Sequence, residues 1–188
     1  MNFNPFPFIE TKHLLLRRLT QGDTNDMFEM RRDPRMYEFL NTKVDENTDE
    51  TKTYIEKMNQ GIDENKWIIW AIEHKQSGKV IGTICIWNIS KKEDSGELGY
   101  GIIPAYQDKG LMKESLVSVI EYGFKVMGLK VMEAYTEEHN ERSIKLLESC
   151  EFVEVGRVDE EGDLNNQVFR MVIFRLLQEQ QARTLRPI

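Results

Sequence analysis

Hydrophobic and polar residues alternate along the chain with two periods, and each period predicts its own kind of element. From residue 112 to 127 the apolar side chains recur every three or four positions, which is the spacing of one buried helical face. Gly128 follows, where a C-terminal cap belongs. Runs rich in β-branched and aromatic residues predict strands at 12–20, 66–73, 79–89, 97–103, 130–136, 152–158 and 167–177.

Capping residues predict three further helices, over about 24–33, 48–61 and 141–150. Asp23 precedes the first and Asn47 the second, and both residue types accept hydrogen bonds from the free N–H groups of a helix start. With the helix at 112–127, the chain therefore has about four helices.

A helix separates the strands at 97–103 and 130–136, so we expect these two strands to lie parallel, joined by a right-handed crossover. The chain ends in a hairpin whose turn is expected at 159–166. No repeat, low-complexity tract or linker interrupts the pattern. We expect one mixed α/β domain over residues 1–188, with a core at about 10–177 and a loose polar tail at 178–188.

The charge balance narrows the class of partner. Lys and Arg total 25 against 32 Asp and Glu, a net charge of −7. An acidic surface argues against general nucleic-acid binding and suits a cationic partner such as a polyamine or a basic peptide. The three histidines lack metal-ligand spacing, so no metal is expected. Trp67, Trp70 and Trp87 lie on predicted strands, where core packing is the default and a wall of an acceptor groove is the alternative.

Two cysteines, one in a predicted strand and one at a helix end, make a disulfide framework unlikely and favour the cytoplasm. The N-terminus lacks a basic region followed by an apolar core, so it is not a signal peptide. No apolar run approaches the roughly 20 residues that span a bilayer, and no membrane association is expected.

The stretch Gln107-Asp108-Lys109-Gly110-Leu111-Met112 joins a strand directly to the helix at 112–127. Such a junction leaves several backbone N–H groups unpaired at the positive end of the helix dipole, an arrangement that binds phosphate. Gly110 lets a diphosphate approach the main chain without meeting a Cβ atom. The alternative is an ordinary loop of an α/β protein, so spacing alone leaves the ligand open.

Three patterns add a resemblance to this interpretation. The first pattern is the loop Gln107-x-x-Gly110-x-Met112, and the second is the stretch 135–152, with Asn140-x-x-Ser143 between a strand and a helix. The third is the strand Glu97-Leu-Gly-Tyr-Gly-Ile at 97–102. They resemble the signatures of the GCN5-related N-acetyltransferases, the GNAT superfamily, and the last is similar to the branch that acetylates ribosomal-protein N-termini. The likeness covers about residues 10–177.

The resemblance implies a mostly antiparallel twisted sheet of about six to seven strands, with one splayed parallel pair and about four flanking helices. It implies acetyl-coenzyme A as co-substrate and a primary amine as acceptor. The loop 107–112 would hold the diphosphate, with Lys109 and Lys113 near it, although both are also ordinary surface lysines. Backbone groups of Ile102 and Ile103 would pair with the pantetheine arm until Pro104, which lacks an N–H, ends the pairing.

The catalytic roles are also implied by the resemblance. Glu97 is expected to remove the ammonium proton through water, beside open space left by Gly99 and Gly101, although a solvated carboxylate at a strand end is the alternative. Asn140 is expected to bond the pantetheine carbonyl, to cap a helix, or both. Ser143 is expected to donate a proton to the thioester sulfur, with water or Tyr135 as substitutes.

The sequence departs from the family pattern at three positions. Met112 stands where the wider family has a small residue, and Glu151 stands where it has glycine before a phenylalanine. Leu147 occupies the position of a frequent tyrosine, which removes the commonest candidate for the general acid.

These departures leave three functions open. A protein or peptide N-terminus is the first acceptor, a small amine such as a polyamine or an aminoglycoside is the second, and a non-catalytic module that senses coenzyme A is the third. Arg31, Arg32 and Tyr37 are candidates for the acceptor groove, with plain surface roles as the alternative. A homodimer is expected from the likeness alone.

Overall fold

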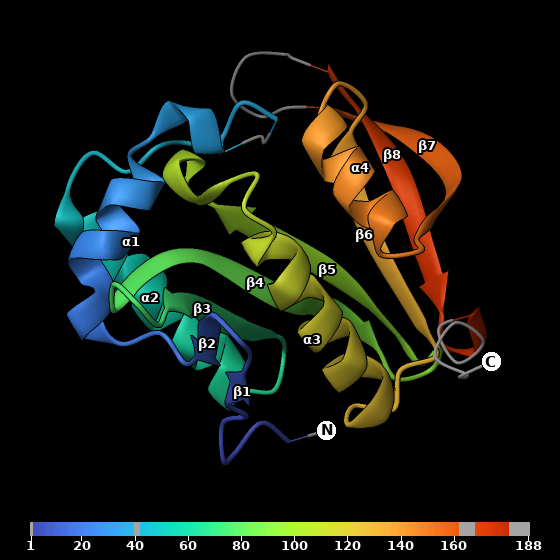
Figure 1. Ribbon diagram of the computed structural model, residues 1–188, viewed down its shortest axis with the longest axis horizontal. Coiled ribbons are helices and arrows are strands. Elements are labelled where there is room, and N and C mark those ends of the chain that lie inside the picture. The colour runs from blue at the N-terminus through green and yellow to red at the C-terminus, as the bar shows by residue number, and fades with distance from the viewer. Residues whose placement is uncertain (1, 40–41, 162–167, 181–188) are drawn as a thin grey trace.

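The structure is a computed structural model that describes residues 2–39, 42–161 and 168–180. It contains an eight-stranded sheet with strand order β1-β2-β3-β4-β5-β6-β8-β7 (Figure 1). All neighbouring strands are antiparallel except β5 and β6. The strands are β1 (Ile9–Glu10), β2 (Leu14–Arg17), β3 (Ile68–His74), β4 (Lys79–Ser90), β5 (Ser95–Ile102), β6 (Val131–Glu137), β7 (Val153–Glu161) and β8 (Val168–Leu177).

Within the described residues, four named α-helices and three short 3-10 helices accompany the sheet, and residues 178–180 are also helical. The α-helices are α1 (Thr24–Arg31), α2 (Thr48–Asp63), α3 (Leu111–Lys125) and α4 (Glu141–Ser149), and the 3-10 helices are η1 (Gln21–Asp23), η2 (Pro34–Met36) and η3 (Pro104–Tyr106). In this part of the chain, no helix is both long and apolar enough to cross a membrane.

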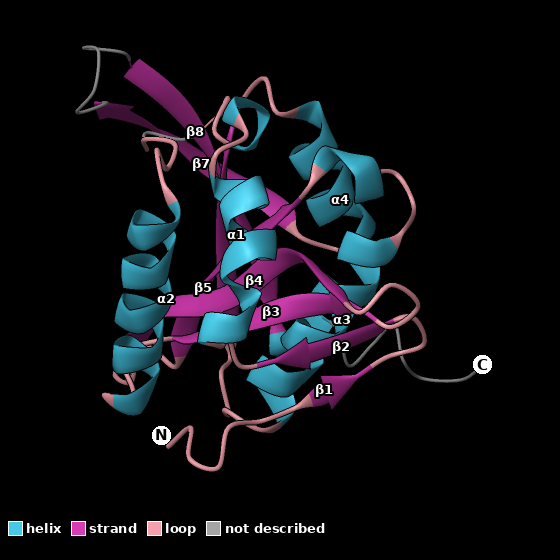
Figure 2. Cartoon of the chain, turned by 90° about the vertical axis from the view of Figure 1, so that its left-hand side faces the viewer, coloured by secondary structure: helices cyan, strands magenta, loops and turns pink. Residues whose placement is uncertain are grey.

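The helices divide between the two faces of the sheet. α3 and α4 lie on one face and α1 and α2 on the other, with the sheet between them (Figure 2). Alternate strand residues such as Ile86, Leu98 and Met132 are buried in the core on the α3 and α4 face. A smaller cluster under α1 and α2 contains Met27 and Ala71. The period-2 pattern of the strands thus supplies apolar residues to both layers.

The approach of α3 to the sheet depends on one small residue. A Cβ atom on Gly123 would overlap the end of the Met132 side chain and lie 3.3 Å from Ile86 Cδ1. Glycine at this position of the apolar stripe therefore lets the helix lie close to β4 and β6. Gly128 follows with φ of +72°, as expected for a glycine C-terminal cap.

The parallel pair β5 and β6 separates partway along its length. Its register runs from Ser95 opposite Val131 to Leu98 opposite Ala134. Beyond that point β5 stays paired with β4 as far as Ile102, while β6 stays paired with β8. Figure 1 shows the two strands side by side at one end and spread apart at the other. The expected parallel pairing is confirmed, and the sheet opens next to residues 99–102.

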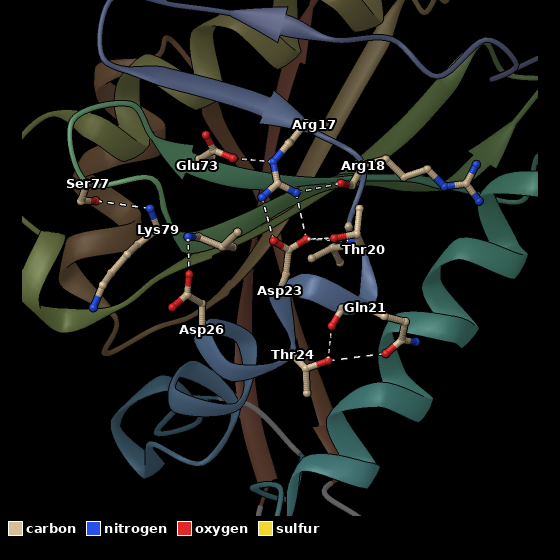
Figure 3. A network of polar contacts seen from close by, with 12 residues as sticks. Arg17, Arg18, Thr20, Gln21, Asp23, Thr24, Asp26, Glu73, Ser77 and Lys79 are labelled. Atoms are coloured by element: carbon tan, nitrogen blue, oxygen red, sulfur yellow. Dashed lines mark hydrogen bonds and ion pairs between the residues drawn. The ribbon is translucent and has the colours of Figure 1, made fainter.

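A polar network lies at β2 and β3, separated from the opening by β4. Arg17 of β2 donates to Asp23 at 2.8 and 2.7 Å, and its Nε lies 2.5 Å from Glu73 Oε2 of β3 (Figure 3). Burial raises the pKa of Asp23, but the bonds from Arg17 and Thr20 outweigh it and leave that pKa below its ordinary value. The network joins β2, β3 and η1 at the start of α1.

The element boundaries correct several expectations. The strand expected at 12–20 covers only Leu14–Arg17, and the two-residue strand β1 was missed, so the sheet has eight strands and not six to seven. Asp23 stands before α1, but its carboxylate contacts Arg17 and Thr20 and does not cap the helix. Asn47 does cap α2, because Oδ1 accepts from the N–H groups of Asp49 and Glu50.

The expectations for the C-terminal region lie partly outside the described residues. The strands of the last hairpin extend to Glu161 and resume at Val168, so most of the expected turn is not described. The same holds for 181–188 of the expected tail. Its first residue is not loose, because Gln178 donates from Nε2 to the carbonyl of Phe124 at 3.2 Å and from its N–H to that of Lys130 at 3.0 Å.

Candidate active site

Glu97 lies on β5 immediately before the point where the parallel pair separates. Its neighbours across the sheet are Trp87 of β4 and Glu133 of β6. Oε2 accepts a long hydrogen bond from Asn88 Nδ2 at 3.4 Å. Burial raises the pKa of Glu97 to about 7, the Asn88 bond lowers it, and the charges of Glu160 and Glu133 raise it. A carboxylate that titrates near neutral pH suits a general base.

The space beside Glu97 is narrower than the two glycines of β5 led us to expect. A Cβ atom on Gly99 would lie 2.9 Å from Cys85 Sγ, and one on Gly101 would lie 3.2 Å from Met36 Cε. Cys85 belongs to the neighbouring strand, and Met36 belongs to η2, which reaches over β5. The expected open space over these glycines is therefore partly filled.

The backbone groups at the end of β5 differ in whether they already have a hydrogen-bond partner. The N–H of Ile103 donates to the carbonyl of Ile81 at 2.9 Å, so it is already used within the fold. In an antiparallel ladder, the groups of the preceding residue point the other way, toward the gap between β5 and β6. The carbonyl of Ile102 accepts from Gln107 Nε2 at 3.1 Å. Pro104 then begins η3, as expected for a residue that ends the pairing.

The loop at 107–112 leaves its backbone open at the start of α3. Gly110 has φ of +76°, and a Cβ atom there would meet nothing within 4 Å. Asp108 also has a positive φ, of 57°. Among the described residues, Glu114 is the first of α3 whose N–H reaches a backbone acceptor, the carbonyl of Gly110 at 3.0 Å. The N–H groups at the start of α3 are therefore available to an anion.

The side chains of the loop divide between core and surface. Leu111 and Met112 are buried in the main core, so the large residue at the sixth position packs inward and leaves the backbone accessible. Lys109 is exposed, with Nζ 5.1 Å from the centroid of the Tyr106 ring. Lys113 is also exposed, and its charge lowers the pKa of Cys150 against the larger effect of burial. Both lysines lie within reach of the first turn of α3.

Asn140 and Ser143 form the start of α4. Asn140 Oδ1 accepts from the N–H of Ser143 at 3.2 Å, so the helix-cap role of Asn140 is confirmed. Ser143 Oγ lies 2.9 Å from the hydroxyl of Tyr100 on β5. This contact joins α4 to β5 across the point where the sheet opens. Burial raises the pKa of Tyr100, so its hydroxyl stays protonated.

Tyr100 was not among the residues expected at the site. Its place in the sequence indicated only that it faces away from Glu97, because neighbouring strand residues alternate between faces. Tyr135, the expected substitute for Ser143, instead has its hydroxyl 3.5 Å from Glu133 Oε2. Ser143 and Tyr100 therefore lie on the α4 side of the sheet, and Glu97 lies on the other.

Two departures from the family pattern have local explanations. Leu147 is fully buried in the main core, so its side chain packs where the family often has a tyrosine. Glu151 has φ of 69°, in the left-handed region that favours glycine. Its N–H donates to the carbonyl of Glu148 at 3.0 Å at the end of α4.

The residues expected at the acceptor groove have different surroundings. Arg31 forms a buried pair with Asp45, at 2.7 and 2.9 Å, and its guanidinium lies 3.8 Å from the centroid of the Tyr54 ring. It therefore has a structural role. Arg32 is within 3.5 Å of Glu29 at the surface, and burial raises the pKa of Tyr37.

The three tryptophans also differ. Trp70 is fully buried, Trp67 is half-buried just before β3, and Trp87 is 46% exposed on the face that carries Glu97. Core packing is therefore confirmed for Trp70 and wrong for Trp87.

One group in the described residues has the composition of a metal site. Potential ligand atoms of Glu137, Glu138 and His139 lie within 4.8 Å of one another. His139 already contacts both oxygens of Glu137, through its N–H at 2.6 Å and through Nδ1 at 2.9 Å. This pairing closes the turn between β6 and α4, and we assign the group a structural role.

Comparison with known proteins gives one consistent result. Residues 13–153 match the family model described as the acetyltransferase (GNAT) domain. The chain is 29% identical to YoaA of Bacillus subtilis, an uncharacterized N-acetyltransferase, over 80% of this chain and 85% of that protein.

Solved structures of similar fold include two enzymes with named acceptors. A ribosomal-protein-S5-alanine acetyltransferase from Vibrio fischeri has a TM-score of 0.81 at 21% identity, covering 92% of this chain and 97% of that one. A spermidine N-acetyltransferase from Vibrio cholerae, in complex with CoA and spermine, has a TM-score of 0.79 at 24% identity, covering 92% and 99%. The expected fold is confirmed, and the chain belongs to the GNAT acetyltransferase family.

Proposed function

We propose that the protein transfers the acetyl group of acetyl-coenzyme A directly to a primary amine while both substrates are bound. One observation carries the proposal: Glu97, with its pKa raised to about 7, lies where the parallel strands separate. An ammonium ion must lose a proton before it attacks a thioester, and a carboxylate of this pKa accepts that proton near neutral pH. The diphosphate of the donor fits the open backbone around Gly110.

The proton acceptor and the group that stabilises the leaving sulfur lie on different faces of the sheet. On the Glu97 face, the carboxylate takes the ammonium proton through water, and the amine nitrogen then attacks the thioester carbon. The carbon–sulfur bond breaks, the negative charge develops on sulfur, and the attacking nitrogen loses its second proton to water as the amide forms. On the other face, the hydroxyl of Ser143 donates a hydrogen bond to that sulfur, while Tyr100 holds the hydroxyl at 2.9 Å. The Tyr100 and Ser143 hydroxyls then form a chain of hydrogen bonds that ends at the sulfur, and such a chain makes its last hydroxyl a stronger donor. Tyr100 acts through Ser143 and is therefore a positioning residue.

The remaining donor contacts follow from the same geometry. The backbone groups of Tyr100 and the N–H of Ile102 face the gap and are available to pair with the pantetheine arm. The N–H of Ile103 and the carbonyl of Ile102 already have partners within the fold. The side-chain amide nitrogen of Asn140 is left over for the pantetheine carbonyl, because the cap uses the oxygen. Loop amides from Asp108 to Met112 hold the diphosphate.

We propose an N-terminal amine of a protein or peptide as the first acceptor class. The Glu-x-Gly-Tyr stretch of β5 and the similarity to the ribosomal-protein acetyltransferase support it. A polyamine is the second class, supported by the carboxylates of Glu160 and Glu133, whose charges act on Glu97, with Glu133 also paired to Arg175 at 2.6 Å. These charges favour an acceptor that keeps a second positive group.

A thiol-release assay with acetyl-coenzyme A tests the proposal. Peptides with different N-terminal residues, spermidine and an aminoglycoside serve as acceptors, and calorimetry measures binding of coenzyme A in parallel. We expect release above background with at least one acceptor class. Binding without release from any amine would instead indicate a non-catalytic module, and absence of binding would overturn the proposal.

A further inference from the structure

A polar bridge spans the opening between α4 and the end of β5. Arg142 Nη1 in the first turn of α4 donates to Gln107 Oε1 at 2.6 Å, and its Nη2 lies 3.5 Å from Asp108 Oδ2. The other end of the Gln107 amide donates to the carbonyl of Ile102 at 3.1 Å. One arginine on α4 is thus connected, through one glutamine, to the strand that borders the gap.

The bridge lies against the loop whose backbone is open to an anion. Gln107 and Asp108 are the first two residues of that loop, and Gly110 and the start of α3 follow directly. Arg142 therefore brings a guanidinium from α4 to the first residues of this loop.

The present partners of Arg142 hold it weakly. Gln107 offers a neutral amide oxygen, and the side chains of Arg142 and Asp108 are 70% and 72% exposed. An ion pair this exposed contributes little to stability, because water solvates both partners well in its absence. Arg142 can therefore exchange these contacts for a more highly charged ligand at small cost.

We infer that Arg142 is the phosphate-binding side chain that α4 contributes to the donor site, beside the loop that offers its amides. This inference rests on the proposed function. A guanidinium presents several N–H groups in one plane and binds phosphate oxygens in pairs, which an ammonium group does not. Exchange of the bridge for a diphosphate also frees Gln107 from the arginine at the moment when the donor enters.

The other cations near the opening are placed differently. Lys109 lies over the Tyr106 ring at 5.1 Å, and Lys145, one turn along α4, is paired with Glu141 at 2.9 Å. Among the described residues, Arg142 alone links α4 to the loop by a direct ion pair or side-chain hydrogen bond. The geometry thus distinguishes Arg142 from its neighbours.

Calorimetry with coenzyme A and with pantetheine, which lacks phosphate, tests the inference on the full chain. A charge-assisted contact to phosphate is worth about 1.5–3 kcal/mol, so Arg142→Gln should weaken coenzyme A binding roughly 10-fold to 100-fold. Binding of pantetheine should change less than about 2-fold, because the lost contact is to phosphate. Lys145→Gln removes the same charge from the same helix and should leave both affinities unchanged.

In kinetics, Arg142→Gln should raise the KM for acetyl-coenzyme A and leave the KM for S-acetyl-pantetheine nearly unchanged. The kcat should change little with either donor. Normal binding of coenzyme A by the Arg142→Gln variant, or an equal loss for both ligands, would overturn this inference and leave the proposed function standing. Failure of the natural protein to bind coenzyme A would overturn both.

Discussion

Two partly buried carboxylates have opposite properties: Asp23 of η1 lies against β2, and Glu97 lies on β5. Asp23 receives two hydrogen bonds from Arg17, and its pKa lies below the ordinary value although burial alone would raise it. Glu97 has a long bond from Asn88 and two acidic neighbours, and its pKa is raised to about 7. Within the described residues, it forms no ion pair.

The difference identifies what each half of the sheet does. In the half formed by β1 to β4, Arg17 pairs with Asp23 and Glu73 and neighbouring strands stay paired along their length, with one bulge at Ile72 and Glu73, so polar groups stabilise the fold. In the half around β5 and β6, the strands separate and an acid is left without a cation. Uncompensated burial of an ionisable group costs stability and is typical of functional sites. The comparison predicts that substitutions in the first half affect folding and substitutions in the second affect activity.

The largest expected effect is on catalysis. Glu97→Gln removes the proton acceptor but keeps the shape, so kcat/KM at pH 8 should fall about 10²-fold to 10⁴-fold. Initial rates of thiol release measure it. Glu93→Gln, an exposed carboxylate in the turn before β5, is the control and should retain full activity. Comparable rates in the Glu97→Gln variant and the natural protein would remove Glu97 from the mechanism.

Substitution in the half of the sheet formed by β1 to β4 should lower the stability of the fold. Arg17→Met leaves Asp23 and Glu73 without their cation in a site where Asp23 is 9% exposed, so the free energy of unfolding should fall by about 3 kcal/mol. Urea denaturation measures it. Arg35→Met breaks the exposed pair with Asp33 and should cause no measurable change. A loss of activity without a loss of stability in Arg17→Met would contradict the division between the halves.

The contact between Ser143 and Tyr100 should produce a smaller effect on turnover. Ser143→Ala and Tyr100→Phe should each lower kcat about 10-fold with little change in the KM for acetyl-coenzyme A, because the hydroxyl acts on the leaving sulfur. The double variant should lose little more than either single one, since both act through one hydrogen bond. If Tyr135→Phe lowers kcat and Ser143→Ala does not, Tyr135 is the donor instead.

The last expected effect is a gain in stability at the site itself. The folded-state pKa of Glu97 lies above its ordinary value of 4.5, so ionisation destabilises the fold as the pH rises from about 4.5 to 7, and the full cost is present above 7. Glu97→Gln should therefore raise Tm at pH 8 and leave it unchanged at pH 4. Thermal unfolding at the two pH values measures this, and an equal shift at both would show that charge is not the cause.

The sequence predicted those features that depend on local spacing. The apolar stripe and its glycines located α3, Asn47 located the start of α2, and the helix between β5 and β6 predicted their parallel pairing. Each depends on residues close together in the chain, or on a connection rule that holds for any sheet.

The features that the sequence did not predict depend on residues far apart in the chain. Cys85 and Met36 fill the space over the glycines of β5, and Arg31 is paired with Asp45. Strand alternation placed Tyr100 on the correct face but did not show its contact with Ser143, 43 positions away. Register and helix placement decide such contacts, and neither is encoded in a local pattern.

The pH dependence of kcat/KM in the natural protein and in Glu97→Gln tests the central claim most directly. The ratio of the two values at each pH cancels the ionisation of the acceptor amine and isolates Glu97. We predict that the natural protein's advantage falls as the pH drops through about 7, where Glu97 becomes protonated, and is constant above it. A ratio that does not change between pH 5 and 9 would contradict the account.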